Sequence, residues 1–479
     1  MINPYALIYL VAHAVPALIG FCALILYTHL LSAAEYGVYV IGASVAGIIS
    51  AVFFAWVRLS VARYQASSPE LDLRAEAIVA YGATALVVAC LTPLAILIVR
   101  PALGLGIIAG SLLLSLSLTA FEISQEFRRA QLEPLRYTII AVTRGLLGLA
   151  LGYIAVALGG GGLGLLLAVG ASFLVVDVLS WHGTAVKPLG AFSGAQLMQF
   201  VRYGLPFLLG ALAFALHGAL DRLSVAYLLG QSAAGYYGLA ADVTRQISMV
   251  LAASAASAVF PMAFRKLAVA GPAATRAQLA EGAELLLALV APVTIWLAVS
   301  ADVVAGALLG AEFQAAAAAL LPVLAIGRMC GALNQYYLHV SFQLAEKPLL
   351  QVVHDCSILS INIALLFPLT LAFGLSGTAA AVLLAEALGI LIGIGLSRRA
   401  FKLPFNGPGM ARVSATALIV AAVTYAAKLI SGGNGFLALA SLAVAGCLGY
   451  GVSALILDVA GIRTAAISLL RPPRNVPAE

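Results

Sequence analysis

A succession of long apolar runs, separated by short stretches with Gly, Pro and charged residues, constrains this chain more than any other feature. Of its 479 residues, 63% are hydrophobic and only 9% are charged, whereas soluble proteins carry about 25% charged residues. A helix needs roughly 20 apolar residues to cross a bilayer. The composition therefore excludes a soluble globular enzyme and predicts an all-α membrane protein with many spans.

The apolar runs predict about 14 transmembrane helices. The first six are expected at residues 6–31, 36–57, 77–99, 103–121, 137–158 and 163–181. The next six are expected at residues 203–228, 235–262, 284–301, 315–342, 349–373 and 376–397. The last two are expected at residues 413–431 and 435–457. The connecting stretches are too short for a soluble catalytic domain, so any function lies within the membrane.

We expect two six-helix lobes around a central cavity, an architecture implied by the internal repeat described below. The expected parts are an N-terminal lobe (1–181), an interlobe linker (182–202), a C-terminal lobe (203–397), and a last part (398–479) with a basic linker, two additional helices and a cytoplasmic tail. Most Lys and Arg residues fall in alternate loops. By the positive-inside rule, both termini are expected to be cytoplasmic. Topology accounts for the net charge of +6, so we expect no nucleic acid as a partner.

An internal repeat supports the two-lobe prediction. The segment LLSAAEYGVY at residues 30–39 resembles LGQSAAGYYG at residues 229–238, with Gly37 opposite Gly235 and Tyr39 opposite Tyr237. Each segment is expected at the hairpin that opens the second span of a lobe. Six spans is an even number, so both lobes enter the membrane in the same orientation, as in transporters built from parallel repeats. Chance similarity between two Ala- and Gly-rich hairpins is the alternative.

Several segments resemble the polysaccharide transporters of the multidrug, oligosaccharidyl-lipid and polysaccharide exporter superfamily. They are LLSAAEYGVY followed by Arg63-Tyr64, the long run from YGLPFLLG through DRLSVAYLLGQSAAGYYGLA, ALLGAEFQAAAAALLPVLAIG and LAEKP. The resemblance implies a flippase of the bacterial cytoplasmic membrane that moves a polyprenyl-pyrophosphate-linked oligosaccharide outward. It also implies a lipid-bilayer setting and other polysaccharide assembly proteins as partners. Lipid II flippases of the same superfamily are similar, but the first span here has His13 and His29 and no arginine, which speaks against a close lipid II role.

Arginines within the predicted spans are the most informative residues for function, because a mid-membrane arginine costs about 2.5–3.5 kcal/mol unless it pairs or faces water. Arg328 and Arg245 are expected near mid-depth and Arg144 nearer the cytoplasmic side. A guanidinium can clasp two phosphate oxygens, so a pyrophosphate head is a plausible ligand. For Arg245 the alternative is local neutralisation by Asp242, three residues earlier on the same helical face. Arg328 has no acid within a turn.

Other polar residues in the spans complete the predicted site. Glu386 is expected to pair with an arginine or to carry a coupling proton. His217 could accept a proton near neutral pH, although a hydrogen-bonded core histidine is the alternative. Asn334, Gln335 and Tyr336 could meet sugar hydroxyls and faces; membrane-interface anchoring would explain the tyrosine equally well.

No catalytic constellation is evident from the sequence, which has no Ser/His/Asp set, metal-ligand spacing or P-loop. We therefore expect no enzyme and no cofactor. Two alternatives to a flippase stay open. A multidrug or cation antiporter would favour carboxylates in a cation-attracting cavity. A polymerase or ligase of lipid-linked sugars usually needs a large external loop, and the outer loops here are short.

Overall fold

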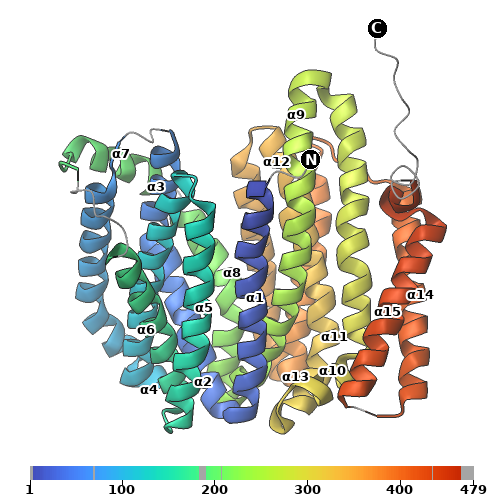
Figure 1. Ribbon diagram of the computed structural model, residues 1–479, viewed down its shortest axis with the longest axis horizontal. Coiled ribbons are helices and arrows are strands. Elements are labelled where there is room, and N and C mark those ends of the chain that lie inside the picture. Colours follow the sequence, from blue (N-terminus) through green and yellow to red (C-terminus); the bar gives the residue numbers. More distant parts are fainter. Residues whose placement is uncertain (1–3, 68–70, 183–189, 206–207, 434, 465–479) are drawn as a thin grey trace. The chain divides into compact units, whose positions relative to one another are not determined.

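The computed structural model describes residues 4–67, 71–182, 190–205, 208–433 and 435–464, and within them the chain is helical (Figure 1). Eleven helices in these ranges are long and apolar enough to cross a membrane, and Ala14–Leu30 is a shorter apolar helix. The all-α membrane fold predicted from the apolar runs is thereby confirmed. The predicted tail after residue 464 and residues 183–189 of the predicted linker lie outside the described residues.

The chain divides into two compact units, Met1–Leu239 and Ala240–Glu479. The helices of the first unit are α1 (Pro4–Leu30), α2 (Ala33–Ile49), the π-helix η1 (Ser50–Phe54), α3 (Ala55–Ser67), α4 (Arg74–Ala130), α5 (Pro134–Ala157), α6 (Gly161–His182), α7 (Gly194–Gly204) and α8 (Leu208–Leu229). Because α8 packs on α2, the span expected at 203–228 lies in this unit. The six-plus-six division of the spans stays a prediction.

The second unit contains most of α9 (Gln231–Val299) and all later helices. These are α10 (Ala301–Leu308), α11 (Ala311–Leu333), the π-helix η3 (Asn334–Leu338), α12 (His339–Leu344), α13 (Pro348–Ser397), α14 (Gly407–Ser431), α15 (Phe436–Leu457) and the short 3-10 helix η4 (Val459–Gly461). Helices α14 and α15 pack side by side as a hairpin (Figure 1). They correspond to the two additional helices predicted at 413–431 and 435–457.

Three long helices are each broken by one glycine, which explains why some predicted spans merge. Gly104 in α4, Gly271 in α9 and Gly374 in α13 have φ of 70°, 77° and 60°, a region that side chains disfavour and glycine tolerates. At Gly374 the chain folds back, since Thr370 Oγ1 lies 2.8 Å from Thr378 Oγ1. The two predicted spans 349–373 and 376–397 are the two arms of α13.

Part of the polar stretch predicted as a linker is a helix. Helix α7 packs on α3 through Phe200, which is buried and stacks on Tyr64 with 5.9 Å between ring centroids. The Ser60 hydroxyl donates a hydrogen bond to the carbonyl of Phe200 (3.0 Å). Ser193 caps the helix by accepting from the backbone N–H of Gln196. This helix escaped prediction because its polar face lowers the apolar content of the stretch below that of a span.

The two repeat segments contact each other directly within the first unit. A Cβ atom built on Gly37 would overlap the carbonyl oxygen of Gln231, and one built on Gly235 would overlap the carbonyl oxygen of Ala33. The same two positions would lie 3.2 Å and 3.0 Å from the backbone nitrogen of the opposite glycine. Equivalent residues therefore make equivalent contacts, which is the geometry of a local two-fold axis and supports the internal repeat over chance similarity.

Candidate functional site

Several polar residues of the second unit gather where α11, η3 and α12 pack against α13. Gly389 and Gly393 on the second arm of α13 permit the close approach. A Cβ on Gly389 would lie 2.6 Å from Ile358 Cγ1 and 3.0 Å from Asn334 Nδ2. A Cβ on Gly393 would lie 2.8 Å from His354 Nε2. Small residues at four-residue spacing thus bring polar side chains of three segments together.

Glu386 and Asn334 form the buried centre of this region. The Asn334 amide donates hydrogen bonds to Glu386 Oε2 (2.7 Å) and to the Glu386 carbonyl oxygen (2.9 Å), and both side chains are buried. Asn334 begins η3, and π-helical turns inside α-helices are frequent at functional sites. The partner seen here is the Asn334 amide. The pairing of Glu386 with an arginine and its coupling role both stay predictions.

Arg328 lies on α11, six residues before Asn334. It is half-buried, and its Nε atom is buried without a hydrogen-bond partner among the described residues. Its neighbour Gly327 faces Leu383 on α13, and Gly331 faces the Glu386 carboxylate. Arg328 is thus a half-buried cation on the helix whose Gly331 faces the Glu386 carboxylate, and its Nε makes no hydrogen bond within the described part of the chain.

The other predicted members of the cluster differ in exposure. Gln335 is exposed and Tyr336 is half-buried, so η3 presents them away from the packed centre that holds Asn334. The buried side chain of this segment is Tyr337, whose hydroxyl donates to the carbonyl of Pro404. The structure brings Asn334 and Glu386 together and leaves Gln335 out of that centre.

Arg245 has the local partner that the alternative interpretation named. Its Nη2 lies 3.2 Å from Asp242 Oδ1, three residues earlier in α9. The side chain of Arg245 is 49% exposed and that of Asp242 17%. The ion pair reduces the cost of placing Arg245 in the span predicted at 235–262, and about half of the side chain of Arg245 stays exposed.

The predicted site residues of the first unit are Arg144 and His217. The guanidinium of Arg144 lies over the Phe173 ring, 3.5 Å from its centroid, as in a cation–π contact. Its Nε is buried without a hydrogen-bond partner in the described part of the chain. His217 lies half-buried in α8. On the same helix, Asp221 accepts a 2.8 Å hydrogen bond from the Tyr237 hydroxyl.

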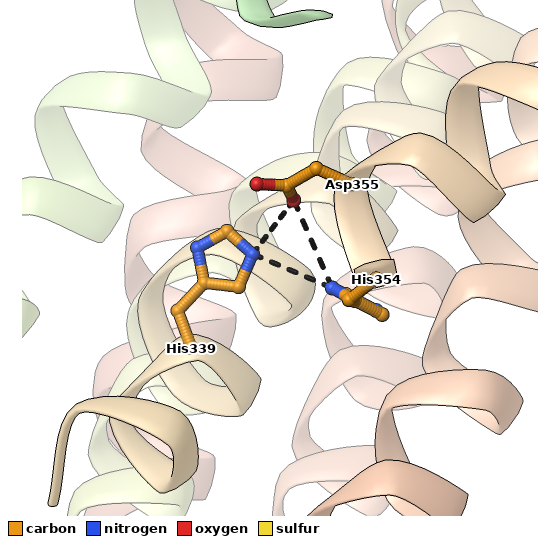
Figure 2. A group of neighbouring side chains, drawn as sticks. All are labelled: His339, His354 and Asp355. Atoms are coloured by element: carbon orange, nitrogen blue, oxygen red, sulfur yellow. Dashed lines mark hydrogen bonds and ion pairs between the residues drawn. The ribbon is translucent and has the colours of Figure 1, made fainter. Parts of the chain in front are cut away.

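A second polar cluster was not predicted from the sequence. His339 from α12 and His354 and Asp355 from α13 converge, with His339 Nε2 2.9 Å from Asp355 Oδ1 and 3.4 Å from His354 Nδ1 (Figure 2). Their nitrogen and oxygen atoms could hold a metal ion. Helices α12 and α13 meet at the turn around Ala345–Lys347. Along the sequence, His339 precedes this turn and His354 follows it by similar numbers of residues. Two histidines placed symmetrically about LAEKP were the available signal.

Comparison with known proteins agrees with this architecture. The family model described as polysaccharide biosynthesis protein matches residues 26–318, which is more than half of the chain. No curated protein matches the sequence.

Solved structures that share the fold include a lipid II flippase and a multidrug transporter. The lipid II flippase MurJ in an inward closed conformation has a TM-score of 0.72 at 14% identity, with 98% of this chain and 99% of that chain covered. A multidrug resistance MATE family transporter of the MOP superfamily, in an inward-facing conformation, has a TM-score of 0.60 at 14% identity, with coverages of 81% and 97%. The chain belongs to the polysaccharide biosynthesis protein family and has the fold of the MOP superfamily transporters.

Proposed function

We propose that the protein is a flippase that moves a polyprenyl-pyrophosphate-linked oligosaccharide across the bacterial cytoplasmic membrane by alternating access, with both termini cytoplasmic. The family and the fold support a transporter of polysaccharide assembly. The observation that carries the proposal is Arg328, a half-buried guanidinium in a membrane-spanning helix whose buried Nε lacks a hydrogen-bond partner in the described residues.

The chemistry of the substrate fits that cation. A guanidinium stays charged in a protein and presents its donors in a planar fork that matches the oxygens of a phosphate group. A pyrophosphate head would offset the cost of an intramembrane arginine, which is otherwise about 2.5–3.5 kcal/mol. In this proposal Arg328 binds the pyrophosphate, Arg245 and Arg144 add positive charge, and Gln335 and Tyr336 contact the sugars.

The membrane potential supplies a driving force in this mechanism. Each elementary charge moved across the membrane is worth about 2.3 kcal/mol per 100 mV. Moving about two negative charges outward across an inside-negative membrane is then favourable by about 4.6 kcal/mol per 100 mV. Coupling to an ion gradient is not required by this energy balance.

The test is a leaflet-accessibility assay in proteoliposomes with undecaprenyl-pyrophosphate-linked oligosaccharide. We expect Arg328→Ala to reduce the flipping rate at least tenfold, which corresponds to about 1.4 kcal/mol. Arg328→Lys should retain part of the rate, because it keeps the charge but loses the fork. Arg136→Gln is the matched control, since this exposed arginine pairs with Glu133 at a helix start, and it should flip at the wild-type rate.

Each outcome of this assay bears on the proposal. Full activity of an inserted Arg328→Ala protein would overturn the anion-binding role. A wild-type protein that flips no polyprenyl-pyrophosphate-linked glycan would overturn the proposed function itself. If Arg328→Ala fails to insert, the Arg328→Lys rate relative to Arg136→Gln decides the first question.

A further inference from the structure

We propose that His339, His354 and Asp355 form a binding site for a divalent transition metal of the Zn²⁺ class, with three protein ligands and one open position. The site lies within the second unit, on the hairpin of α12 and α13, and it is separate from the pyrophosphate contacts assigned to Arg328. It therefore stands independently of the proposed flippase function.

The distances among the three ligand atoms suit a single metal ion. They are 2.9 Å for His339 Nε2 to Asp355 Oδ1, 3.4 Å for His339 Nε2 to His354 Nδ1, and 3.8 Å for His354 Nδ1 to Asp355 Oδ1 (Figure 2). With bonds of about 2.1 Å to zinc, two ligands of a tetrahedral site lie about 3.4 Å apart. The three observed distances bracket this value, so small side-chain adjustments complete the geometry.

The ring of His354 is already oriented as a ligand. Its Nε2 lies 2.9 Å from the carbonyl oxygen of Gly389, a group that can only accept. The proton of the neutral ring therefore resides on Nε2, and Nδ1 keeps its lone pair toward His339 and Asp355. In metal sites, a histidine ligand usually donates its other ring N–H to a backbone carbonyl or a carboxylate, and this hydrogen bond fixes the orientation of the ring.

The donor atoms and the burial of the three side chains favour a metal such as Zn²⁺ over Mg²⁺ or Ca²⁺. The His354 side chain is fully buried and that of His339 is 11% exposed, while that of Asp355 is 40% exposed. The exposed carboxylate offers an entry path, and the two imidazoles form the buried wall. Mg²⁺ and Ca²⁺ prefer oxygen ligands, whereas two imidazoles and one carboxylate suit Zn²⁺.

Hydrogen bonds within the cluster do not use the lone pairs of all three residues at short distance. If the N–H of His339 is on Nε2, it donates to Asp355 at 2.9 Å and reaches His354 only at 3.4 Å. A metal ion would take the lone pairs of both rings and one carboxylate oxygen at once. The His339 ring would then carry its proton on Nδ1.

The experiment measures metal bound to the full-length protein in detergent. The protein is stripped with a chelator, reloaded with Zn²⁺ and passed through a sizing column, and its metal content is determined by mass spectrometry. We expect one tightly bound zinc per chain. The variants His339→Gln, His354→Gln and Asp355→Asn should each weaken zinc affinity by about tenfold or more in competition with a chromophoric chelator.

A matched control and a second probe make the result decisive. His29→Gln changes an exposed histidine on α1 and should leave zinc binding unchanged. Loading with Co²⁺ should give the visible absorption of a tetrahedral site in the wild-type protein and not in His339→Gln. Wild-type zinc content or affinity no greater than that of His339→Gln would overturn the proposal and leave a hydrogen-bonded cluster only.

Discussion

Hydrogen bonds between separate segments hold several of the buried polar side chains in these helices. In hydrocarbon an unpartnered polar group costs several kcal/mol, because no water replaces the missing hydrogen bond. The Asn334 amide offsets part of this cost by donating two hydrogen bonds to Glu386, while the Oδ1 atom of Asn334 is buried without a hydrogen-bond partner among the described residues. The interaction joins η3 to the second arm of α13, and η3 lies between α11, which carries Arg328, and α12, which carries His339.

Removal of this amide should destabilise the protein. Asn334→Ala leaves the Glu386 carboxyl buried without its amide donor, and we expect the free energy of unfolding to fall by about 1–3 kcal/mol. Gln335→Ala changes the adjacent, exposed side chain and is the control. It should change the free energy of unfolding by less than about 0.5 kcal/mol. Unfolding in mixed micelles compares the two variants, and equal stabilities would contradict the assigned role.

Asp72, in the segment before α4, gives a pH-dependent contribution to stability. Arg74 donates to both of its carboxylate oxygens (2.8 and 2.7 Å), and with the Gly190 N–H it lowers the pKa of Asp72 to about 2. The unfolded pKa is about 3.9. A depressed folded pKa stabilises the protein above the unfolded value, and that stabilisation is lost as pH falls through the folded value.

Asp72→Asn should therefore lower Tm by a constant amount above about pH 5, and the difference from wild type should shrink between about pH 4 and pH 2. Thermal unfolding of the wild-type and Asp72→Asn proteins between about pH 2 and pH 7 measures this Tm difference. A Tm difference that does not change with pH would show that the carboxylate's charge is not what stabilises this loop.

At the scale of elements, close helix approach depends on a few glycines. The repeat segments that open α2 and α9 contact each other through Gly37 and Gly235, and the contacts are nearly symmetric. The helix α2 is also capped by a capping box, with Ser32 and Glu35 bonding each other's backbone N–H. Local sequence thus sets the start of α2. The close packing of the two repeat segments depends on Gly37 and Gly235, which have no side chain.

Gly37→Ala tests this packing. The added methyl would collide with the carbonyl of Gln231, a backbone group that cannot move aside cheaply, and overpacking of this kind costs about 1–3 kcal/mol or more. We expect a clear loss of Tm in detergent. Gly47→Ala is the matched control on the same helix, because a Cβ there meets nothing within 4 Å. Equal Tm values for the two variants would contradict direct contact of the repeats.

At the scale of the whole molecule, fold similarity persists where sequence identity is low. The chain aligns with the MurJ structure over 98% of its length at only 14% identity. Lipid-facing helices require apolar length and internally satisfied backbones rather than particular side chains. The same architecture therefore tolerates wide substitution.

The sequence by itself determined the membrane class, the helical architecture and most helix positions. Bilayer thickness fixes the length of an apolar run, and a run such as 436–457 needs no tertiary information to be recognised. The helix α15, Phe436–Leu457, starts one residue from its prediction. The Asp242–Arg245 pair was equally accessible, because three residues along a helix place two side chains on one face.

Only the tertiary structure decided which polar groups meet. Asn334 and Glu386 are 52 residues apart, and their contact depends on how the arms of α13 fold at Gly374. The same fold-back supplies the Gly389 carbonyl that orients His354. Apolar periodicity states that a helix exists but not which neighbour it packs against, since lipid and protein offer similarly apolar surroundings.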